Sequence, residues 1–141
     1  MKEYRASTMI EATPETIWEI LTDAARYPEW DLGVDKIEGT IALGEKIAAH
    51  SKLRPGRAFP VKVSEFVPGR KMVWSGGIPL GLFRGERTFT LTPRGNGVTE
   101  FTLREVFSGP LLAVFGRSIP DLTSSFEQFA AGLKSRAERG K

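Results

Sequence analysis

The sequence contains no cysteine and only one histidine among its 141 residues. Without cysteine there is no disulfide framework, no thiolate zinc site and no cysteine nucleophile. The histidine, His50, shares strand parity with Lys46, Ala48 and Lys52, which predicts that it points away from the protein interior. One outward histidine without cysteine companions argues against a metal site and against a serine–histidine–acid triad.

Strong charge of one sign is also lacking, since 20 basic and 17 acidic residues give a net charge of +3. The basic residues are scattered except for the final run KSRAERGK, whereas nucleic-acid binding usually needs a concentrated basic face with stacking aromatics. The runs SGGIPLG and RGNG lack the spacing and lysine of a phosphate loop, so we predict turns there. We therefore expect neither a nucleic-acid partner nor a bound cofactor.

Two kinds of apolar segment are missing as well. The composition, with 40% hydrophobic and 26% charged residues, is that of an ordinary globular protein and does not suggest membrane insertion. The amino-terminal stretch MKEYRASTMIEATPE lacks the apolar core of a secretory signal. The length suits one hydrophobic core, so we expect a single cytoplasmic domain over residues 1–141.

What is present is a clear change of periodicity along the chain. Alternating polar and apolar residues predict a strand from about Tyr4 to Ile10. The next segment, ATPETIWEILTD, has helical spacing, with Thr13 placed as the N-cap and Pro14 at the first helical position. A short helix is therefore expected after the first strand.

The middle of the chain, residues 34–107, reads almost entirely as strand, broken at short intervals by LGE, RPG, VPG, SGG and RGNG. Such spacing predicts about six strands joined as an antiparallel meander. Helical periodicity then returns in a long amphipathic segment, with Pro120 in its first turn and apolar residues at Ile119, Leu122, Phe126, Phe129 and Leu133. The expected class is α+β: a curved antiparallel sheet of about seven strands wrapped around a long C-terminal α-helix, with short helices after the first strand.

Three segments carry a family resemblance: ATPETIWEILTDAARYPEW, MVWSGGIPLGLFRGERTFTLTPRGNGVTEFTLREVFSGPLL and FEQFAAGLKSRAE. Together they resemble the START-like helix-grip (SRPBCC) superfamily, in its polyketide cyclase/dehydrase and lipid-transport branch. The resemblance covers essentially the whole chain and implies a helix-grip fold. It also implies a cavity between sheet and long helix for a hydrophobic small molecule or lipid, without specifying a reaction.

Two strands flanking the RGNG turn each place one charge on an otherwise apolar face. Matching these faces pairs Leu91 with Phe101, and it then sets Arg87 opposite Glu105. An inward charge without a partner is costly, so an ion pair is expected. It would serve either as a polar anchor for a ligand or as a bridge between strands. The resemblance implies a histidine at the position of Arg87 in many members, and arginine cannot act as a general base.

The segment YPEW raises a separate question, because it places Tyr27 and Trp30 on a connector after the short helix. In the family pattern this segment lies near the cavity mouth, which implies that both residues contact a ligand. Alternatively, they plug a gap between helix and sheet, because aromatic side chains bury large areas.

The other candidate lining residues are apolar, and in a filled interior they would pack as ordinary core. Glu65 shares the parity of a predicted inner face but adjoins the VPGR turn, so we expect it to be exposed. The candidate ligand-binding set is Tyr27, Trp30, Phe59, Trp74, Phe83, Arg87, Phe101, Glu105, Phe126 and Phe129, with Met72 as further lining.

Three functions remain open from the sequence. The leading one is a binding module for a hydrophobic small molecule or lipid, oriented by Arg87 and Glu105. The second is an enzyme similar to polyketide cyclases or dehydratases, in which positioning supplies much of the catalysis and Glu105 is the one inward acid. The third is a protein-interaction or quinone-binding module, for which the short basic C-terminus is a weak argument. Catalytic residues and oligomeric state are not predicted.

Overall fold

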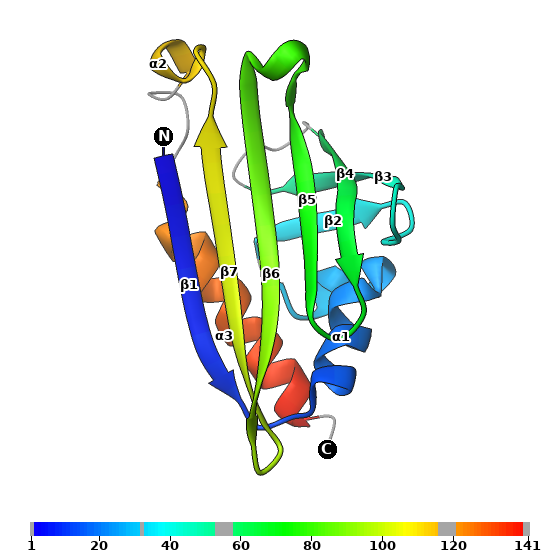
Figure 1. Cartoon of the computed structure of the whole chain (residues 1–141). Coiled ribbons are helices and arrows are strands. Elements are labelled where there is room, and N and C mark those ends of the chain that lie inside the picture. The colour runs from blue at the N-terminus through cyan, green and yellow to red at the C-terminus, as the bar shows by residue number, and fades with distance from the viewer. Residues whose placement is uncertain (1, 32, 53–57, 116–120, 140–141) are drawn as a thin grey trace.

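The computed structural model describes residues 2–31, 33–52, 58–115 and 121–139. The α+β architecture predicted from the sequence is confirmed, with a curled antiparallel sheet and a long C-terminal helix against one face of it (Figure 1). In chain order the elements are β1 (Lys2–Ile10), α1 (Pro14–Thr22), η1 (Ala24–Glu29), β2 (Val34–Glu38), β3 (Lys46–Ser51), β4 (Ala58–Val67), β5 (Lys71–Ile78), η2 (Pro79–Gly81), β6 (Phe83–Gly95), β7 (Val98–Ser108), α2 (Leu112–Phe115) and α3 (Thr123–Arg139).

The sheet has seven strands in the order β1-β7-β6-β5-β4-β3-β2, so only β1 leaves the sequential meander, by pairing with β7. The predicted register of β6 and β7 is confirmed, because Leu91 lies opposite Phe101 and Arg87 lies opposite Glu105. Since side chains alternate between the faces of a strand, this register places all four residues on the same inner face.

The short helix α1 begins as the sequence predicts. The Thr13 hydroxyl accepts a hydrogen bond from the Thr16 amide at 3.3 Å, and Pro14 occupies the first turn, where its missing N–H costs nothing. Ile17 and Leu21 point inward and are fully buried. The connector that follows is itself ordered as the 3₁₀ helix η1, which positions the aromatic residues of YPEW.

The long helix α3 begins at Thr123, whose amide donates to the Asp121 carboxylate at 2.9 Å. This start lies later than predicted, because an aspartate cap precedes Thr123; Ile119 and Pro120 fall outside the described residues. The inner face of α3 buries Phe126, Phe129, Ala130, Leu133 and Ala137. In the part of the chain that the structure describes, no helix is both long and apolar enough to cross a membrane.

Candidate functional site

The inner face of β6 and β7 is buried along one half of these two strands. Phe89, Phe101 and Leu103 have no exposed surface, and Leu91 has almost none. The ring of Phe129 on α3 lies 5.8 Å from that of Phe89 and 5.9 Å from that of Phe101. These contacts leave the rings packed as in an ordinary core. We call this half the closed end.

Tyr27 and Trp30 belong to the closed end. Their side chains are 1% and 4% exposed, and their ring centroids lie 6.2 Å and 5.0 Å from that of Phe129. The Tyr27 hydroxyl donates to the Leu21 carbonyl at 2.5 Å, which ties η1 to the end of α1. A side chain at Gly132 would collide with the Trp30 carbonyl, so this glycine lets α3 approach the connector closely. Both aromatics therefore fill the gap between helices and sheet.

Along the same strands the inner face becomes accessible toward the other half. Tyr4, Glu105 and Arg87 form one row across β1, β7 and β6. All three are partly exposed, as are Phe107 and Phe83 in the rows beyond them. We call this region, with Tyr4, Phe83, Arg87, Glu105 and Phe107, the open end.

The Arg87–Glu105 pair is the polar centre of the open end. Arg87 Nη2 and Nε donate to the same oxygen, Glu105 Oε1, at 2.9 Å and 3.2 Å. The guanidinium carbon also lies 5.0 Å from the centre of the Phe126 ring, in cation–π contact with α3. The arginine side chain is 29% exposed and the glutamate side chain 14%. The pair is thus held rigidly and still reached by solvent.

Aromatic rings surround this pair. Phe83 and Phe107 stack with their centroids 6.0 Å apart, and Tyr4 meets Phe107 edge to face at 6.3 Å. Gly85 lies opposite Phe107, and a Cβ there would lie only 3.2 Å from its ring. The absence of a side chain at Gly85 therefore allows Phe107 to lie across β6, which extends the apolar surface beside the ion pair.

Asp31 is a buried acid that the sequence interpretation missed. This residue is 8% exposed and lies two positions after the end of η1, and its Oδ1 accepts a hydrogen bond from the Gly33 amide at 3.0 Å. Burial raises the pKa of the Asp31 carboxyl, while that hydrogen bond and the positive charges of Arg87 and Lys52 oppose the rise. The signal was the Asp-x-Gly spacing after a buried tryptophan, which is typical of an Asx turn.

Two buried indole groups have no hydrogen-bond partner within the described residues: Trp30 Nε1 and Trp74 Nε1. Leaving such a donor unpaired costs about 1–3 kcal/mol. Trp74 is directly opposite Arg87 on the neighbouring strand, so its orphan donor belongs to the same row as the ion pair. A hydrogen-bond acceptor bound near Arg87 would give the Trp74 N–H the partner that it lacks.

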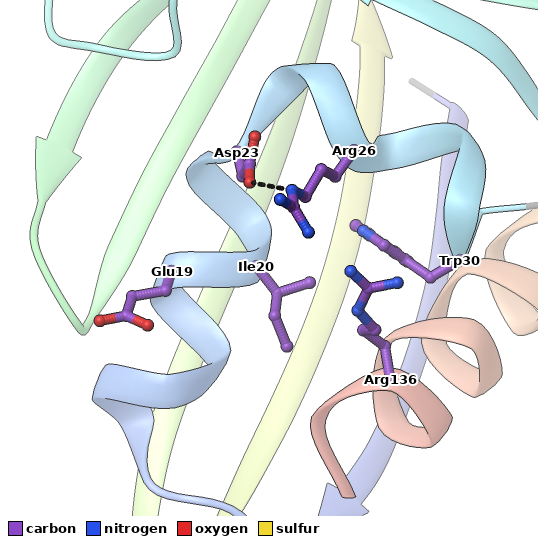
Figure 2. A pocket seen from close by; sticks show the side chains of 6 residues that line it. All are labelled: Glu19, Ile20, Asp23, Arg26, Trp30 and Arg136. Carbon is purple, nitrogen blue, oxygen red and sulfur yellow. Dashed lines mark ion pairs between the residues drawn. The ribbon is translucent and has the colours of Figure 1, made fainter. Parts of the chain in front are cut away.

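A surface pocket of about 240 Å³ lies elsewhere, between α1, η1 and α3 (Figure 2). Among its charged side chains, Arg26 pairs with Asp23 at 3.4 Å and Arg136 pairs with Glu29 at 2.7 Å. Ile20 and Trp30 supply its apolar wall. This pocket lies outside the sheet-and-helix interior and does not include the ion pair of the open end.

The remaining sequence candidates are placed as follows. Trp74 is 4% exposed and Phe126 2%, so both are buried at the boundary of the two ends. Phe59 lies in β4, but its side chain is outside what the structure describes. Glu65 is exposed and pairs with Lys71 at 3.5 Å, as expected from its turn.

His50 pairs with Glu38 on the face of β2 and β3 that also carries the exposed Lys36. Among the residues that the structure describes, histidine, aspartate and glutamate side chains form no group of three or more suited to a metal ion. Of the sequence-predicted set, the fold brings Phe83, Arg87, Glu105 and Phe126 together.

The comparisons with known proteins agree with this architecture. A family model described as polyketide cyclase/dehydrase and lipid transport matches residues 1–138. The chain therefore belongs to this family. It has the helix-grip fold of the START-like superfamily, as the resemblance implied, and no curated protein matches it.

Solved structures show the same fold at low sequence identity. A hypothetical protein from Helicobacter pylori superposes with a TM-score of 0.77 at 13% identity, covering 96% of this chain and 88% of its own. A START superfamily protein from Mycobacterium smegmatis gives 0.71 at 16%, covering 99% of each chain. The ZhuI aromatase/cyclase from Streptomyces sp. R1128 gives 0.70 at 15%, covering 98% and 94%.

Proposed function

We propose that the protein binds a hydrophobic small molecule or lipid at the open end, with the polar group of the ligand against Arg87 and Glu105. The observation that carries this proposal is the change in burial along β6 and β7. The same inner face is sealed at Phe89 and Phe101 and accessible at Arg87 and Phe107. Apolar walls with a few convergent polar groups are characteristic of small-molecule sites.

The hydrogen-bonding capacity of the pair supports a polar anchor. Both hydrogen bonds that Arg87 donates to Glu105 end on Oε1, whereas Oε2 lies toward Gly85, 3.7 Å from the position of a Cβ there. A guanidinium has five N–H donors, so donors remain for a ligand oxygen. The aromatic rings of Phe83 and Phe107 lie within reach of the adjoining apolar part of such a ligand.

The filled closed end limits what can bind. Because the Phe129 ring contacts the rings of both Phe89 and Phe101, a ligand that entered deeply would have to displace these side chains. We therefore expect the bound apolar part to lie against the rim formed by Tyr4 and Phe107. A compact amphipathic molecule suits this geometry better than a long chain buried along the helix.

The test is a binding titration with two amphipathic probes, dodecanoate and 1-anilinonaphthalene-8-sulfonate. Arg87→Met should weaken binding of both by about tenfold or more, as expected for loss of a charge-assisted hydrogen bond. Arg94→Met is the matched control, since Arg94 pairs with Glu100 on the same two strands but on the exposed side of the hairpin. Equal affinities in the two variants would contradict the proposal.

A double variant separates anchoring from folding. Removing Arg87 alone leaves Glu105 unpaired, which itself destabilises the strands. Replacing both residues by Met removes that penalty, so stability should recover while probe affinity stays low. If affinity recovered together with stability, the pair would be a structural bridge and not an anchor.

Asp31 favours a second candidate function, an enzyme of the aromatase/cyclase type. Burial raises the pKa of the Asp31 carboxyl even though the positive charge of Arg87 opposes the rise, so this buried acid is suited to donating a proton. The test is incubation with a linear poly-β-keto thioester, followed by product analysis. If the Asp31 carboxyl donates a proton in the reaction, Asp31→Asn should abolish the cyclised product. If the wild-type protein forms no product, ligand binding stands as the proposed function and the enzyme is rejected.

A further inference from the structure

The surface pocket between α1, η1 and α3 is a cavity that the proposed function does not use (Figure 2). Six residues line it: Glu19, Ile20, Asp23, Arg26, Trp30 and Arg136. Its volume is about 240 Å³, just below the range of about 300–1,000 Å³ that is typical of pockets for drug-sized ligands. We call this cavity the outer pocket. Its volume suits a ligand smaller than a typical drug molecule.

Trp30 brings to the outer pocket a hydrogen-bond donor that the fold does not use. The residue is 4% exposed, and its Nε1 atom is buried without a hydrogen-bond partner among the described residues. The ring cannot turn to find one, because its centroid lies 4.7 Å from that of Tyr27 and 5.0 Å from that of Phe129. Figure 2 shows the indole nitrogen directed toward the side chains of Arg26 and Arg136. An unpaired buried donor is unfavourable, and a ligand with an acceptor atom would pair it.

The charges around the outer pocket balance one another. Glu19 and Asp23 supply its negative charges. Arg26 and Arg136 supply its positive charges, and they already pair with Asp23 and Glu29. A charged ligand of either sign would therefore lie beside a like charge, which is unfavourable, whereas an uncharged ligand would not. The pocket thus favours an uncharged molecule that carries a hydrogen-bond acceptor.

Access to the Trp30 N–H depends on the side chain of Arg26. This side chain is 63% exposed, and it is held by a pair with Asp23, only three residues away on the surface. Exposed pairs of this kind contribute little to stability, so the Arg26 side chain can turn aside when a ligand enters. Ile20 and the ring of Trp30 then form an apolar wall beside the donor.

We propose that the outer pocket binds a small uncharged carbonyl compound, an amide or a ketone, whose oxygen accepts a hydrogen bond from Trp30 Nε1. The aliphatic part of this ligand lies against Ile20. Arg136 uses Nη2 to pair with Glu29, and a guanidinium has five N–H donors, so a second donor remains for the other lone pair of the carbonyl oxygen.

The outer pocket is separate from the open end, and the two sites can be tested independently. Arg87 and Glu105 lie on the inner face of the sheet and do not line the outer pocket. The expected ligands differ as well, because the ion pair of the open end receives a polar or charged head group. The outer pocket receives an uncharged one.

The experiment is a two-dimensional NMR titration of isotope-labelled full chain with isobutyramide, in which the indole N–H signals are followed. The chain has three tryptophans, and Trp→Phe variants assign their signals. Isobutyramide should move the Trp30 signal saturably and leave that of Trp74 in place, although the Trp74 indole is also buried without a partner among the described residues. Isobutyrate, which has the same shape and a negative charge, should bind about tenfold or more weakly because it brings like charges together.

Three variants locate the binding site. Trp30→Phe removes the donor and should weaken isobutyramide binding, followed through the amide signals of α1, by about tenfold or more. Trp18→Phe is the matched control, because Trp18 is also on α1 but packs against Phe66 and does not line the outer pocket. It should bind like the wild type. Ile20→Phe keeps the indole and narrows the pocket, so it should also weaken binding, and it tests the site even if Trp30→Phe does not fold.

Four results would overturn the proposal: no saturable movement of the Trp30 signal, equal movement of the Trp74 signal, equal affinities for isobutyramide and isobutyrate, or undiminished binding by Ile20→Phe. A parallel titration with dodecanoate reports on the Arg87 site. Failure of the outer pocket is thereby distinguished from failure of the proposed function.

Discussion

The two ends of the inner face use the same strands for opposite purposes. At the closed end, Phe89 and Phe101 meet the Phe129 ring from α3 and exclude water. At the open end, the same alternation brings Arg87 and Glu105 to the surface that α3 covers only in part, through Phe126. One amphipathic strand pair can therefore supply both a core and a site, depending on how far the covering helix seals it.

The closed end should be the more sensitive to truncation. Phe129→Ala removes the ring that contacts the aromatics of β6, β7 and η1, and it should lower the free energy of unfolding by about 3–5 kcal/mol. Urea denaturation of the purified variant measures this loss. A loss of less than about 1 kcal/mol would mean that this half is not packed as described.

The open end should respond less in stability and more in binding. Glu105→Gln keeps the shape of the side chain but removes its charge, so Arg87 loses its ionic partner in a partly buried position. We expect about 1–2 kcal/mol of destabilisation together with altered probe affinity. Paired urea and probe titrations check this, and a variant that changed stability alone would favour a purely structural bridge.

Asp31 should make the stability of the protein depend on pH. Because its folded-state pKa is raised, ionising this carboxyl disfavours the folded state, and stability falls as pH rises from the unfolded-state value of about 3.9 through the folded-state pKa. Asp31→Asn retains the acceptor for the Gly33 amide and should be more stable than the wild type at neutral pH. Denaturation at several pH values should show this advantage vanish below about pH 4, and an advantage independent of pH would contradict the assignment.

The smallest effect is expected for the exposed ion pair of the same hairpin. Arg94 pairs with Glu100 near the turn, where the arginine side chain is 51% exposed. Arg94→Met should change the free energy of unfolding by less than about 1 kcal/mol, as exposed pairs usually do. Thermal denaturation in low and high salt would measure it, and a loss equal to that of Glu105→Gln would erase the distinction between the two pairs.

Much of this organisation was predictable from periodicity. Alternation fixed which residues of β6 and β7 share a face, and the need to bury every phenylalanine fixed the register that joins Arg87 to Glu105. Thr13 and Pro14 marked the start of α1 for equally local reasons. These features depend on neighbours in sequence or across one turn.

What the sequence left open depends on distant packing. From the sequence, Tyr27 and Trp30 could either contact a ligand or fill a gap in the core. Their contacts with the ring of Phe129, about a hundred residues away, place them in the core. Asp31 was missed because its burial results from η1 folding against the interior. The exposure of Leu80 was not predicted, because it follows from the backbone geometry of the β5–β6 connection, which a run of glycine and proline does not specify.

The most direct test of the central claim is a two-dimensional NMR titration of isotope-labelled protein with dodecanoate. Binding at the open end predicts the largest amide shifts at Gly85, Glu105 and Phe107, small shifts at Phe89 and Phe101, and loss of the effect in Arg87→Met. Shifts confined to the surface pocket at Glu19 and Arg136, or no saturable shifts at all, would contradict it.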